Sequence, residues 1–307
     1  MAGRRLLKGS RSPALSLRHP IRSLQIIMEM VKFEHTVFAL PFAFMGAVLA
    51  GRSLGRPHGL PPASTLGWIL LAMVGARTAA MAFNRIVDAR YDSENPRTRG
   101  RAIPSGTVTI RQAWILTAGA ALAFFVAAWQ LNRLCMLLSP IALVAVTTYS
   151  WTKHFTTWTH VALGAAIGIA PVGAWLAVMG RFGLLPILLW AVVTLWIGGF
   201  DIIYALQDME VDRRLGLHSL PVRVGAATAL RISFWMHALM LGLLGVVGIV
   251  GSLGGWYYAG VLIAAAILGY EHAIVAPDDL SRVNTAFFTL NGWMSVLLSL
   301  FLLIDVW

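Results

Sequence analysis

Long apolar stretches alternate with short polar segments along the whole chain. Nine such stretches can be distinguished, and each is close to the ~20 residues that an α-helix needs to cross the hydrocarbon core of a bilayer. Their approximate ranges are 31–51, 66–87, 112–131, 134–151, 158–180, 184–207, 229–253, 256–275 and 285–306. A transmembrane β-barrel would instead show segments of about ten residues that alternate between apolar and polar. The sequence does not alternate in that way, so the pattern predicts an all-α integral membrane protein.

The polar segments between the apolar stretches are too short to hold a separate soluble domain. The sequence therefore predicts a single membrane domain over residues 1–307, with a basic N-terminal segment at 1–30. Composition agrees, because 12% of the residues are charged and 58% are hydrophobic. A soluble domain carries about 25% charged residues.

The net charge of +11 can be understood from the positions of the 24 Lys and Arg residues. When the chain is threaded through nine spans, 18 of them fall on the side of the N-terminus. The remaining six are four on the opposite side and two within the second span: Arg52, Arg56, Arg133 and Arg181, then Arg77 and Arg85. This asymmetry follows the positive-inside rule, and it explains the basic composition without a nucleic-acid partner. It predicts that the N-terminus and the even-numbered loops are cytoplasmic.

The predicted location is a bacterial inner membrane. The first 19 residues are rich in Arg and Ser and contain no acidic residue. Mitochondrial transit peptides share that composition, so a mitochondrial inner membrane remains an open alternative.

Acidic residues are scarce, and seven of the thirteen lie in two short windows. One window follows the second apolar stretch and the other ends the sixth. Each contains an Asp-x-x-x-Asp pair, followed by basic residues, a Pro and a Gly. The acidic residues are Asp88, Asp92 and Glu94 in the first window, and Asp201, Asp208, Glu210 and Asp212 in the second. The repeat predicts two pseudo-repeated four-helix halves plus one helix, with the two acidic ends facing each other across a cavity.

Residues four apart lie on the same face of a helix, so each window predicts one polar row. The rows are Asn84, Asp88 and Asp92 in the first window, and Tyr204, Asp208 and Asp212 in the second. Carboxylates at this spacing repel each other and need a positive partner. Carboxylate and amide oxygens suit Mg²⁺, which commonly binds through one or two carboxylates and a substrate phosphate. Since arginines suited to phosphate surround the rows, the pattern indicates a metal–phosphate site.

The alternative interpretation is a set of solvated loop charges at a membrane surface. It would account for one Asp-x-x-x-Asp pair, but two copies at equivalent places favour a functional site, since acids at membrane depth are usually functional. A cation-coupled transporter is a more distant alternative, because its acidic residues would be spread along a transmembrane path.

The two rows resemble the motifs N-x-x-x-D-x-x-x-D and Y-x-x-x-D-x-x-x-D of the UbiA family of intramembrane prenyltransferases. The sequence NPRTRGRAIPSG after the first motif is also similar to the family, and the nine spans agree with it, so the resemblance covers nearly the whole chain. A third family segment, Y-S-x-x-K-R, is matched by YSWTKH at Tyr149, Ser150 and Lys153. His154 stands where the family usually has Arg, so the chain departs from the family pattern at the second basic residue of this segment.

The resemblance implies transfer of a polyprenyl group from polyprenyl diphosphate to an aromatic acceptor, with Mg²⁺ as the cofactor. It implies that the metal ligands are Asp88, Asp92, Asp208 and Asp212, assisted by Asn84. The implied substrate-binding residues are Asn84, Arg85, Arg97, Arg101, Tyr149, Lys153 and Tyr204, with Lys153 at the diphosphate. Asp201 lies one turn deeper than the second row. It is the candidate for assisting the acceptor or taking the ring proton, and pairing with Arg85 is its structural alternative.

The segment KFEHTVFALPFAF resembles a 4-hydroxybenzoate polyprenyltransferase-like subgroup, some members of which use a naphthoate acceptor in a menaquinone route. This implies a small aromatic acid as acceptor, with Lys32, Glu34 and His35 on its side of the site. In the alternative, Lys32 extends to the membrane interface and Glu34 pairs locally. The predicted reaction is Mg²⁺-dependent prenylation of 4-hydroxybenzoate in quinone biosynthesis, or of a dihydroxynaphthoate in menaquinone biosynthesis.

Overall fold

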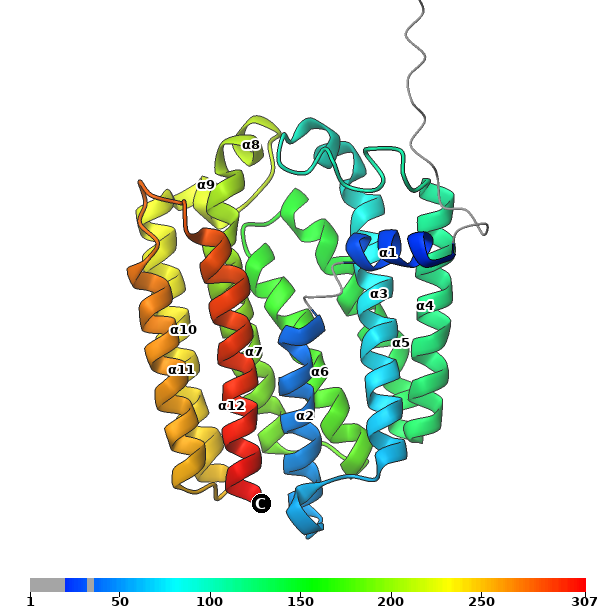
Figure 1. Cartoon of the computed structure of the whole chain (residues 1–307), viewed down its shortest axis with the longest axis vertical. Helices are drawn as coiled ribbons and strands as arrows, with labels where there is room; N and C mark the ends of the chain where they lie inside the picture. The colour runs from blue at the N-terminus through cyan, green and yellow to red at the C-terminus, as the bar shows by residue number, and fades with distance from the viewer. Residues whose placement is uncertain (1–19, 32–35) are drawn as a thin grey trace, which may run out of the picture.

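The computed structural model describes residues 20–31 and 36–307, and its regular elements there are helices (Figure 1). The long helices are α2 (Thr36–Ser53), α3 (Ala63–Glu94), α4 (Ile110–Leu131), α5 (Arg133–Thr148), α6 (Thr159–Met179), α7 (Leu184–Ala205), α10 (Ala226–Val250), α11 (Gly255–Ala273) and α12 (Asn291–Val306). The short elements are α1 (Pro20–Met30), η2 (Pro57–Gly59), η3 (Tyr149–His154), η4 (Leu206–Asp208), α8 (Met209–Arg214), α9 (Leu220–Val224) and the π-helix η5 (Thr285–Leu290).

Seven helical segments in this described part of the chain are long and apolar enough to cross a membrane. They contain α3, α4, α5, α6, α7, α10 and α12. Residues 39–53 of α2 form a further, shorter apolar helix, and both α2 and α11 run beside these seven segments (Figure 1). Together these nine helices of the described part of the chain correspond one to one to the predicted apolar stretches, with ends displaced by up to seven residues. The prediction of an all-α integral membrane bundle is confirmed.

The order of helix packing repeats in the way that the sequence predicts. In the first half α3 packs against α4 and α4 against α5, and in the second half α7 packs against α10 and α10 against α11. The helix α6 packs against both α2 and α7, while α12 packs against α2 and α11. This arrangement brings the ends of α3 and α7, which carry the two acidic windows, to the same end of the bundle (Figure 1).

Glycines allow the central helices to approach closely. A Cβ atom at Gly164 of α6 would lie 2.3 Å from the carbonyl oxygen of Thr194 in α7. A Cβ atom at Gly46 of α2 would lie 2.4 Å from the carbonyl oxygen of Pro171 in α6. Small residues at such contacts are typical of helices that pack inside a membrane, where dispersion contacts replace the hydrophobic effect between helices.

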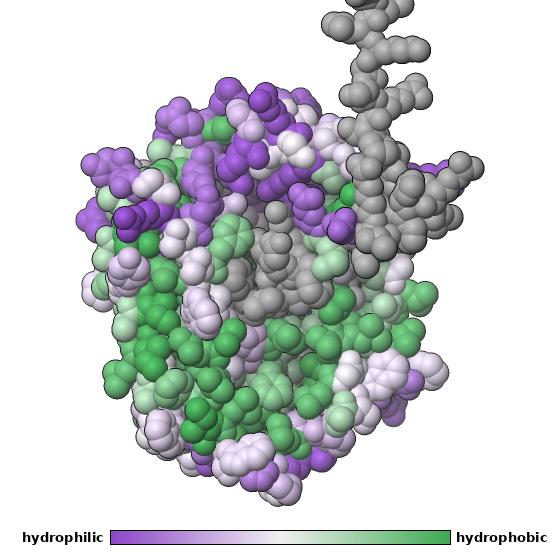
Figure 2. All heavy atoms as spheres, in the orientation of Figure 1, coloured by the Kyte–Doolittle hydropathy of each residue, from purple (hydrophilic) through white to green (hydrophobic). Residues whose placement is uncertain are grey.

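The surface is divided into a polar end and an apolar belt. Figure 2 shows hydrophilic residues gathered at the end of the bundle that carries α8 and α9, above a broad hydrophobic band. Large apolar side chains such as Leu122, Ile141 and Leu262 are exposed along the helices. Such an exposed apolar surface is suited to contact with lipid chains rather than water.

Candidate active site

A cavity of about 750 Å³ lies between the two halves at the polar end of the bundle. Its walls contain every predicted site residue that the structure describes. These residues are Asn84, Arg85, Asp88, Asp92, Arg97, Arg101, Tyr149, Lys153, Asp201, Tyr204, Asp208 and Asp212. Lys32, Glu34 and His35 lie outside the described residues. Residues from three separate parts of the sequence, 84–101, 149–153 and 201–212, therefore meet at one site.

The first wall is the polar row of α3, and its geometry is that of a regular helix. Asn84 donates from Nδ2 to Asp88 Oδ2 at 3.1 Å, as expected for residues four apart. Asp88 and Asp92 are only 4% and 5% exposed. Lys153 Nζ lies 3.0 Å from Asp88 Oδ2, and Arg101 Nη1 lies 2.7 Å from Asp92 Oδ1. Each buried carboxylate thus has one basic partner, which offsets the repulsion within the row.

The second wall is organised around Arg97, which comes from the loop after α3. Its Nε donates to Asp208 Oδ1 at 2.9 Å, Nη2 donates to Asp208 Oδ2, and Nη1 donates to the Tyr204 hydroxyl at 2.9 Å. Asn95 of the same loop donates from Nδ2 to Asp208 Oδ1 at 3.0 Å. Burial opposes the charged form, but the hydrogen bonds and the charge of Asp208 hold the pKa of Arg97 above its usual value. The first acidic window therefore reaches across the cavity and binds the second.

The second row differs from its predicted form. The helix α7 ends at Ala205, the 3₁₀ turn η4 carries Asp208, and the separate helix α8 carries Asp212. A 3₁₀ turn has 3.0 residues per turn instead of 3.6, so it turns the following residues away from the face that Tyr204 occupies. The predicted continuous α-helical row is thus interrupted, although Tyr204, Asp208 and Asp212 line the same cavity.

The loops above the cavity are tied to one another by further contacts. Arg214 Nη2 donates to the carbonyl oxygen of Glu94 at 3.2 Å, where α3 ends, and a positive group is favourable at a helix C-terminus. The backbone N–H of His218 donates to the carbonyl oxygen of Lys153 at 2.7 Å. The segments that follow α3, α5 and α7 therefore hold one another over the site.

Arg85 also faces this cavity, but part of its guanidinium has a structural partner. Its Nε donates to the carbonyl oxygen of Met30 at 3.1 Å, at the end of α1, and the side chain is buried. This contact attaches α1 to α3 beside Asn84. Arg85 thus joins the rim of the cavity to α1.

Asp201 has a partner that the sequence did not indicate. Its Oδ2 lies 2.6 Å from Nδ1 of His160 in α6. The backbone N–H of Leu220 donates to His160 Nε2 at 3.3 Å, so the imidazole proton is on Nδ1 and is donated to Asp201. Within the described residues Asp201 therefore pairs with His160, not with Arg85. The two residues are 41 positions apart, and no local pattern joins them.

The oxygen-rich walls are chemically suited to a hard divalent cation. Asp88 Oδ1 is buried without a hydrogen-bond partner among the described residues, and Asn84, Asp92, Asp208 and Asp212 add amide and carboxylate oxygens. Across residues 20–31 and 36–307, no three His, Cys, Asp or Glu side chains converge as a ready metal cluster. The carboxylates stand on two walls, each wall paired with bases. A cation would thus bind through one or two carboxylates together with an anionic ligand, which is the usual mode for Mg²⁺.

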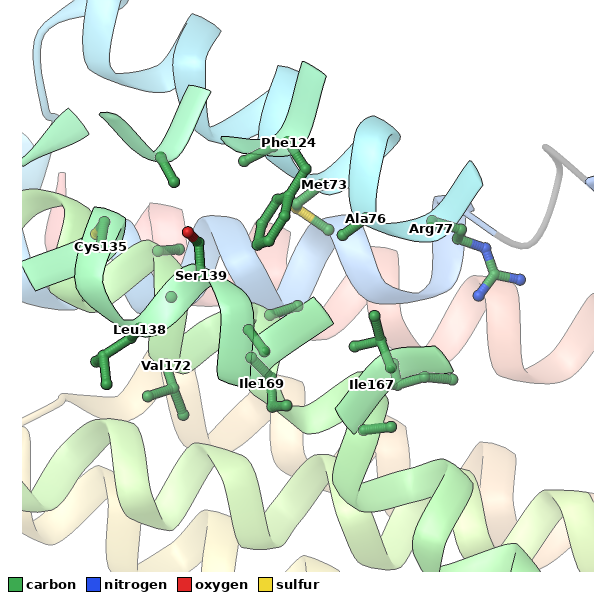
Figure 3. Close-up of a pocket in the computed structure, with 18 of the residues that line it drawn as sticks. Met73, Ala76, Arg77, Phe124, Cys135, Leu138, Ser139, Ile167, Ile169 and Val172 are labelled. Carbon is green, nitrogen blue, oxygen red and sulfur yellow. The ribbon is translucent and has the colours of Figure 1, made fainter. Parts of the chain in front are cut away.

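A second, apolar cavity of about 310 Å³ adjoins the first (Figure 3). It lies between α3, α4, α5 and α6. The two cavities share five lining residues, Ala39, Arg77, Met81, Tyr149 and Ile167. Arg77 lies at one end of the pocket in Figure 3, and its Nε is buried with no hydrogen-bond partner in the described part of the chain. From the sequence, Arg77 is predicted only to be a charge within the second span, but a buried charge at that depth indicates a functional role.

Comparison with known proteins agrees with this architecture. Residues 39–294 match the model of the UbiA prenyltransferase family. A 4-hydroxybenzoate octaprenyltransferase from Aromatoleum aromaticum is 31% identical over 247 residues, which is 80% of this chain and 83% of that protein. The protein of the same name from Salmonella paratyphi C is 31% identical over 244 residues, 78% of this chain and 83% of the other.

Two solved structures share the fold. A UbiA homologue from Aeropyrum pernix K1 superposes with a TM-score of 0.79 at 32% identity, and the alignment covers 89% of this chain and 98% of that one. A UbiA homologue from Archaeoglobus fulgidus, solved with GPP and Mg²⁺ bound, superposes with a TM-score of 0.69 at 17% identity. That alignment covers 92% of this chain and 99% of the other.

Proposed function

Because the chain belongs to the UbiA prenyltransferase family, we propose that it transfers a polyprenyl group from polyprenyl diphosphate to the ring of a small aromatic acid, with Mg²⁺ as cofactor. The observation that carries this proposal is the junction of two different cavities. One is lined by carboxylates and bases from both halves, and the other is apolar. A substrate with a charged head and a long hydrocarbon tail matches both.

The diphosphate head is assigned to the charged cavity. Arg97, Arg101 and Lys153 each bind an aspartate there, and the same groups suit phosphate oxygens. Asp88, Asp92, Asp208 and Asp212, with Asn84, would hold the metal ion. Bound Mg²⁺ would supply Lewis-acid stabilisation of the negative charge that develops on the departing diphosphate. The fold neighbour from Archaeoglobus fulgidus binds GPP and Mg²⁺, which supports this assignment.

The prenyl tail is assigned to the apolar cavity between α3 and α6. Its walls are made by residues such as Met73, Phe124 and Ile169 (Figure 3). An apolar site excludes the water that would otherwise capture an electron-poor allylic carbon. Tyr149 and Met81 line both cavities, so C1 of the chain would lie near them.

The transfer itself exchanges a C–O bond for a C–C bond. The bond between C1 of the prenyl chain and the diphosphate oxygen breaks, and its electron pair leaves with the diphosphate. The ring carbon beside the phenol hydroxyl bonds to C1, and loss of the ring proton restores aromaticity. Asp201 is the proposed group for holding the phenol or taking that proton, with its carboxylate fixed by His160. Arg77, at the junction of the cavities, is a suitable partner for the acceptor carboxylate.

The proposed acceptor is 4-hydroxybenzoate. The relatives from Aromatoleum aromaticum and Salmonella paratyphi C, each 31% identical to this chain, carry that substrate in their names. The proposed location is a bacterial inner membrane with the charged cavity on the cytoplasmic side, as the distribution of Lys and Arg predicts. A dihydroxynaphthoate acceptor presents the same carboxylate and phenol, and it is the alternative for this site.

An acceptor panel tests the proposal. The purified protein in lipid is given Mg²⁺, a polyprenyl diphosphate and one aromatic acid at a time, and prenylated products are identified by mass spectrometry. Product with 4-hydroxybenzoate and not with dihydroxynaphthoate supports the ubiquinone-type reaction. Product with dihydroxynaphthoate alone moves the protein to a menaquinone-type reaction. If no acid is prenylated although the diphosphate binds, the assignment of the acceptor is wrong.

A further inference from the structure

A cluster of four buried polar residues lies inside the second half of the bundle, behind the wall of the charged cavity. It consists of Trp196 in α7, His237 in α10, Glu271 in α11 and Asn291 in α12, and we call it the Trp196 cluster. Glu271 and Asn291 are 0% exposed. None of the four lines either cavity described above. Polar groups buried at membrane depth are costly, so their presence calls for a specific role.

Hydrogen bonds fix Trp196 in this cluster from two sides. Its indole N–H donates to Asn291 Oδ1 at 2.6 Å. Its carbonyl oxygen accepts from His237 Nε2 at 3.2 Å. Asn291 in turn donates from Nδ2 to Glu271 Oε2 at 3.1 Å, so that Glu271 orients the amide for Trp196.

The same Asn291 amide also stabilises an irregular helix. Its Nδ2 donates to the carbonyl oxygen of Ala286 at 2.9 Å, within the π-helix η5. π-Helical turns are rare and are frequent at functional sites. This one carries Phe287 and Phe288, and both line the charged cavity. Asn291 therefore joins the buried cluster to a wall of the site.

Aromatic contacts lead from Trp196 to Tyr204, and hydrogen bonds through Arg97 continue from Tyr204 to Asp208. Trp196, Phe200 and Tyr204 are four apart on one face of α7, and the ring centroids of Trp196 and Phe200 are 5.3 Å apart. The ring of Phe287 contacts both Phe200 and Tyr204, with ring centroids 5.0 Å and 4.2 Å apart, respectively. The Tyr204 hydroxyl accepts from Arg97, which binds Asp208 through two further hydrogen bonds.

We propose that Trp196, Asn291 and Glu271 are positioning residues for the diphosphate half-site at Asp208. They join the Trp196 end of the Trp196–Phe200–Tyr204 face to the π-helix. This holds Phe287 against Tyr204, and it holds Tyr204 where its hydroxyl can orient Arg97. The effect passes through packed rings and hydrogen bonds, and none of the three residues touches the substrate. This inference rests on the proposed function, because it assigns the ligand of the Asp208 half-site as a metal-bound diphosphate.

Conservative variants separate positioning from general stability. Trp196→Phe keeps the ring against Phe200 but removes the indole N–H. The matched control is Tyr257→Phe, which removes a buried hydroxyl in the same half that donates to the Leu244 carbonyl oxygen at 2.8 Å. Tyr257 is fully buried and contacts neither cavity. Trp196→Phe and Tyr257→Phe therefore each remove one buried hydrogen bond.

The measurement is equilibrium binding of geranyl diphosphate in the presence of Mg²⁺, with the thermal midpoint of each variant recorded beside it. We expect Trp196→Phe to raise Kd about fivefold, the size of one lost hydrogen bond of about 1 kcal/mol. Asn291→Leu removes all three hydrogen bonds of the Asn291 amide and should raise Kd at least as much. Tyr257→Phe should lower the thermal midpoint by about as much as Trp196→Phe does, and it should leave Kd unchanged. The double variant Trp196→Phe/Asn291→Leu should have a Kd no higher than that of the single variant with the higher Kd, because the two residues act as a pair. Glu271→Gln keeps an acceptor for Asn291 and should bind nearly as well as the wild type.

Two results would overturn the inference. One is an unchanged Kd in both Trp196→Phe and Asn291→Leu while the wild type binds in a Mg²⁺-dependent way. The other is an equal loss of affinity in Tyr257→Phe, since the higher Kd would then follow from lower stability of the fold and not from the position of Tyr204. If the wild type itself does not bind geranyl diphosphate with Mg²⁺, the proposed function fails first, and the two failures are therefore distinguishable.

Discussion

At the scale of single residues, the site is a set of acid–base pairs that hold each other. Asp92 pairs with Arg101, Asp88 with Lys153, and Asp208 with Arg97. Asp88 and Asp92 come from the end of α3 and Asp208 from the 3₁₀ turn η4 after α7, and each base comes from a loop or short helical turn above the cavity. In the proposed complex a diphosphate and a metal ion would replace these contacts, because the bases would then bind phosphate and the acids would bind the cation.

The acids should therefore be essential for transfer but not for membrane insertion. We expect Asp88→Asn and Asp208→Asn each to lower kcat by about 100-fold or more, because the stabilisation of the leaving diphosphate is lost. Asp278→Asn, in the exposed loop after α11, is the matched control and should keep wild-type kcat. Steady-state transfer assays on purified protein measure the effect. Wild-type kcat in both site variants would contradict the metal–diphosphate site.

Arg97 should not be replaceable by lysine. Its planar guanidinium binds both oxygens of Asp208 and the Tyr204 hydroxyl at once, which a single ammonium group cannot do. We expect Arg97→Lys to weaken Mg²⁺-dependent binding of the prenyl diphosphate by about tenfold, or about 1.4 kcal/mol. Arg99 lies two residues away in the same loop and is exposed, so Arg99→Lys should leave the binding of the prenyl diphosphate unchanged. Equal behaviour of the two variants in a binding titration would remove Arg97 from the site.

At the scale of secondary structure, α3 and its counterpart show what the sequence can predict. The row Asn84, Asp88 and Asp92 forms as the i, i+4 spacing requires, because α3 is one regular helix as far as Glu94. The counterpart is broken between Ala205 and Met209 by a 3₁₀ turn. Residue spacing alone does not distinguish the two cases, since the contacts that hold Asp208 in this turn come from Asn95 and Arg97, more than 100 residues away in the sequence.

Close helix contacts make a prediction about stability. Gly164→Ala places a methyl group 2.3 Å from the Thr194 carbonyl oxygen, a backbone atom that cannot move without shifting α7. We expect a loss of about 1–3 kcal/mol, the usual cost of overpacking. Gly173 lies on the same helix α6, and a Cβ added there would meet no atom of the described residues within 4 Å, so Gly173→Ala should be neutral or slightly stabilising. Thermal unfolding in detergent compares the two, and equal midpoints would contradict the close packing of α6 on α7.

At the scale of the whole molecule, two cavities of opposite character meet between the halves of one bundle. The sequence predicted the charged cavity, because the acidic windows repeat and carry recognisable motifs. It did not predict the apolar cavity, the His160–Asp201 pair or the Trp196 cluster. These features join residues far apart in sequence, such as Trp196 and Asn291 at 95 positions, and each residue alone reads as ordinary helix packing.

The apolar cavity should limit the length of the prenyl chain. Leu138 and Cys135 lie at the end of the pocket opposite Arg77 in Figure 3. We expect Leu138→Trp to lower kcat/KM for a long polyprenyl diphosphate by about tenfold, by filling the far end, and to leave geranyl diphosphate little changed. Leu137→Trp is the control, since Leu137 is 61% exposed and lies outside the pocket. If the long and short substrates respond alike to Leu138→Trp, the tail does not occupy this cavity.

In the proposed reaction, departure of the diphosphate is coupled to formation of a carbon–carbon bond. The most direct test incubates the purified protein in lipid with Mg²⁺, octaprenyl diphosphate and 4-hydroxybenzoate, and quantifies released diphosphate and ring-prenylated product in the same sample. We expect one molecule of prenylated product for each diphosphate released, and neither product nor released diphosphate after the cation is chelated. Release of diphosphate without prenylated acid would contradict it, because the protein would then be hydrolysing its donor rather than transferring the chain.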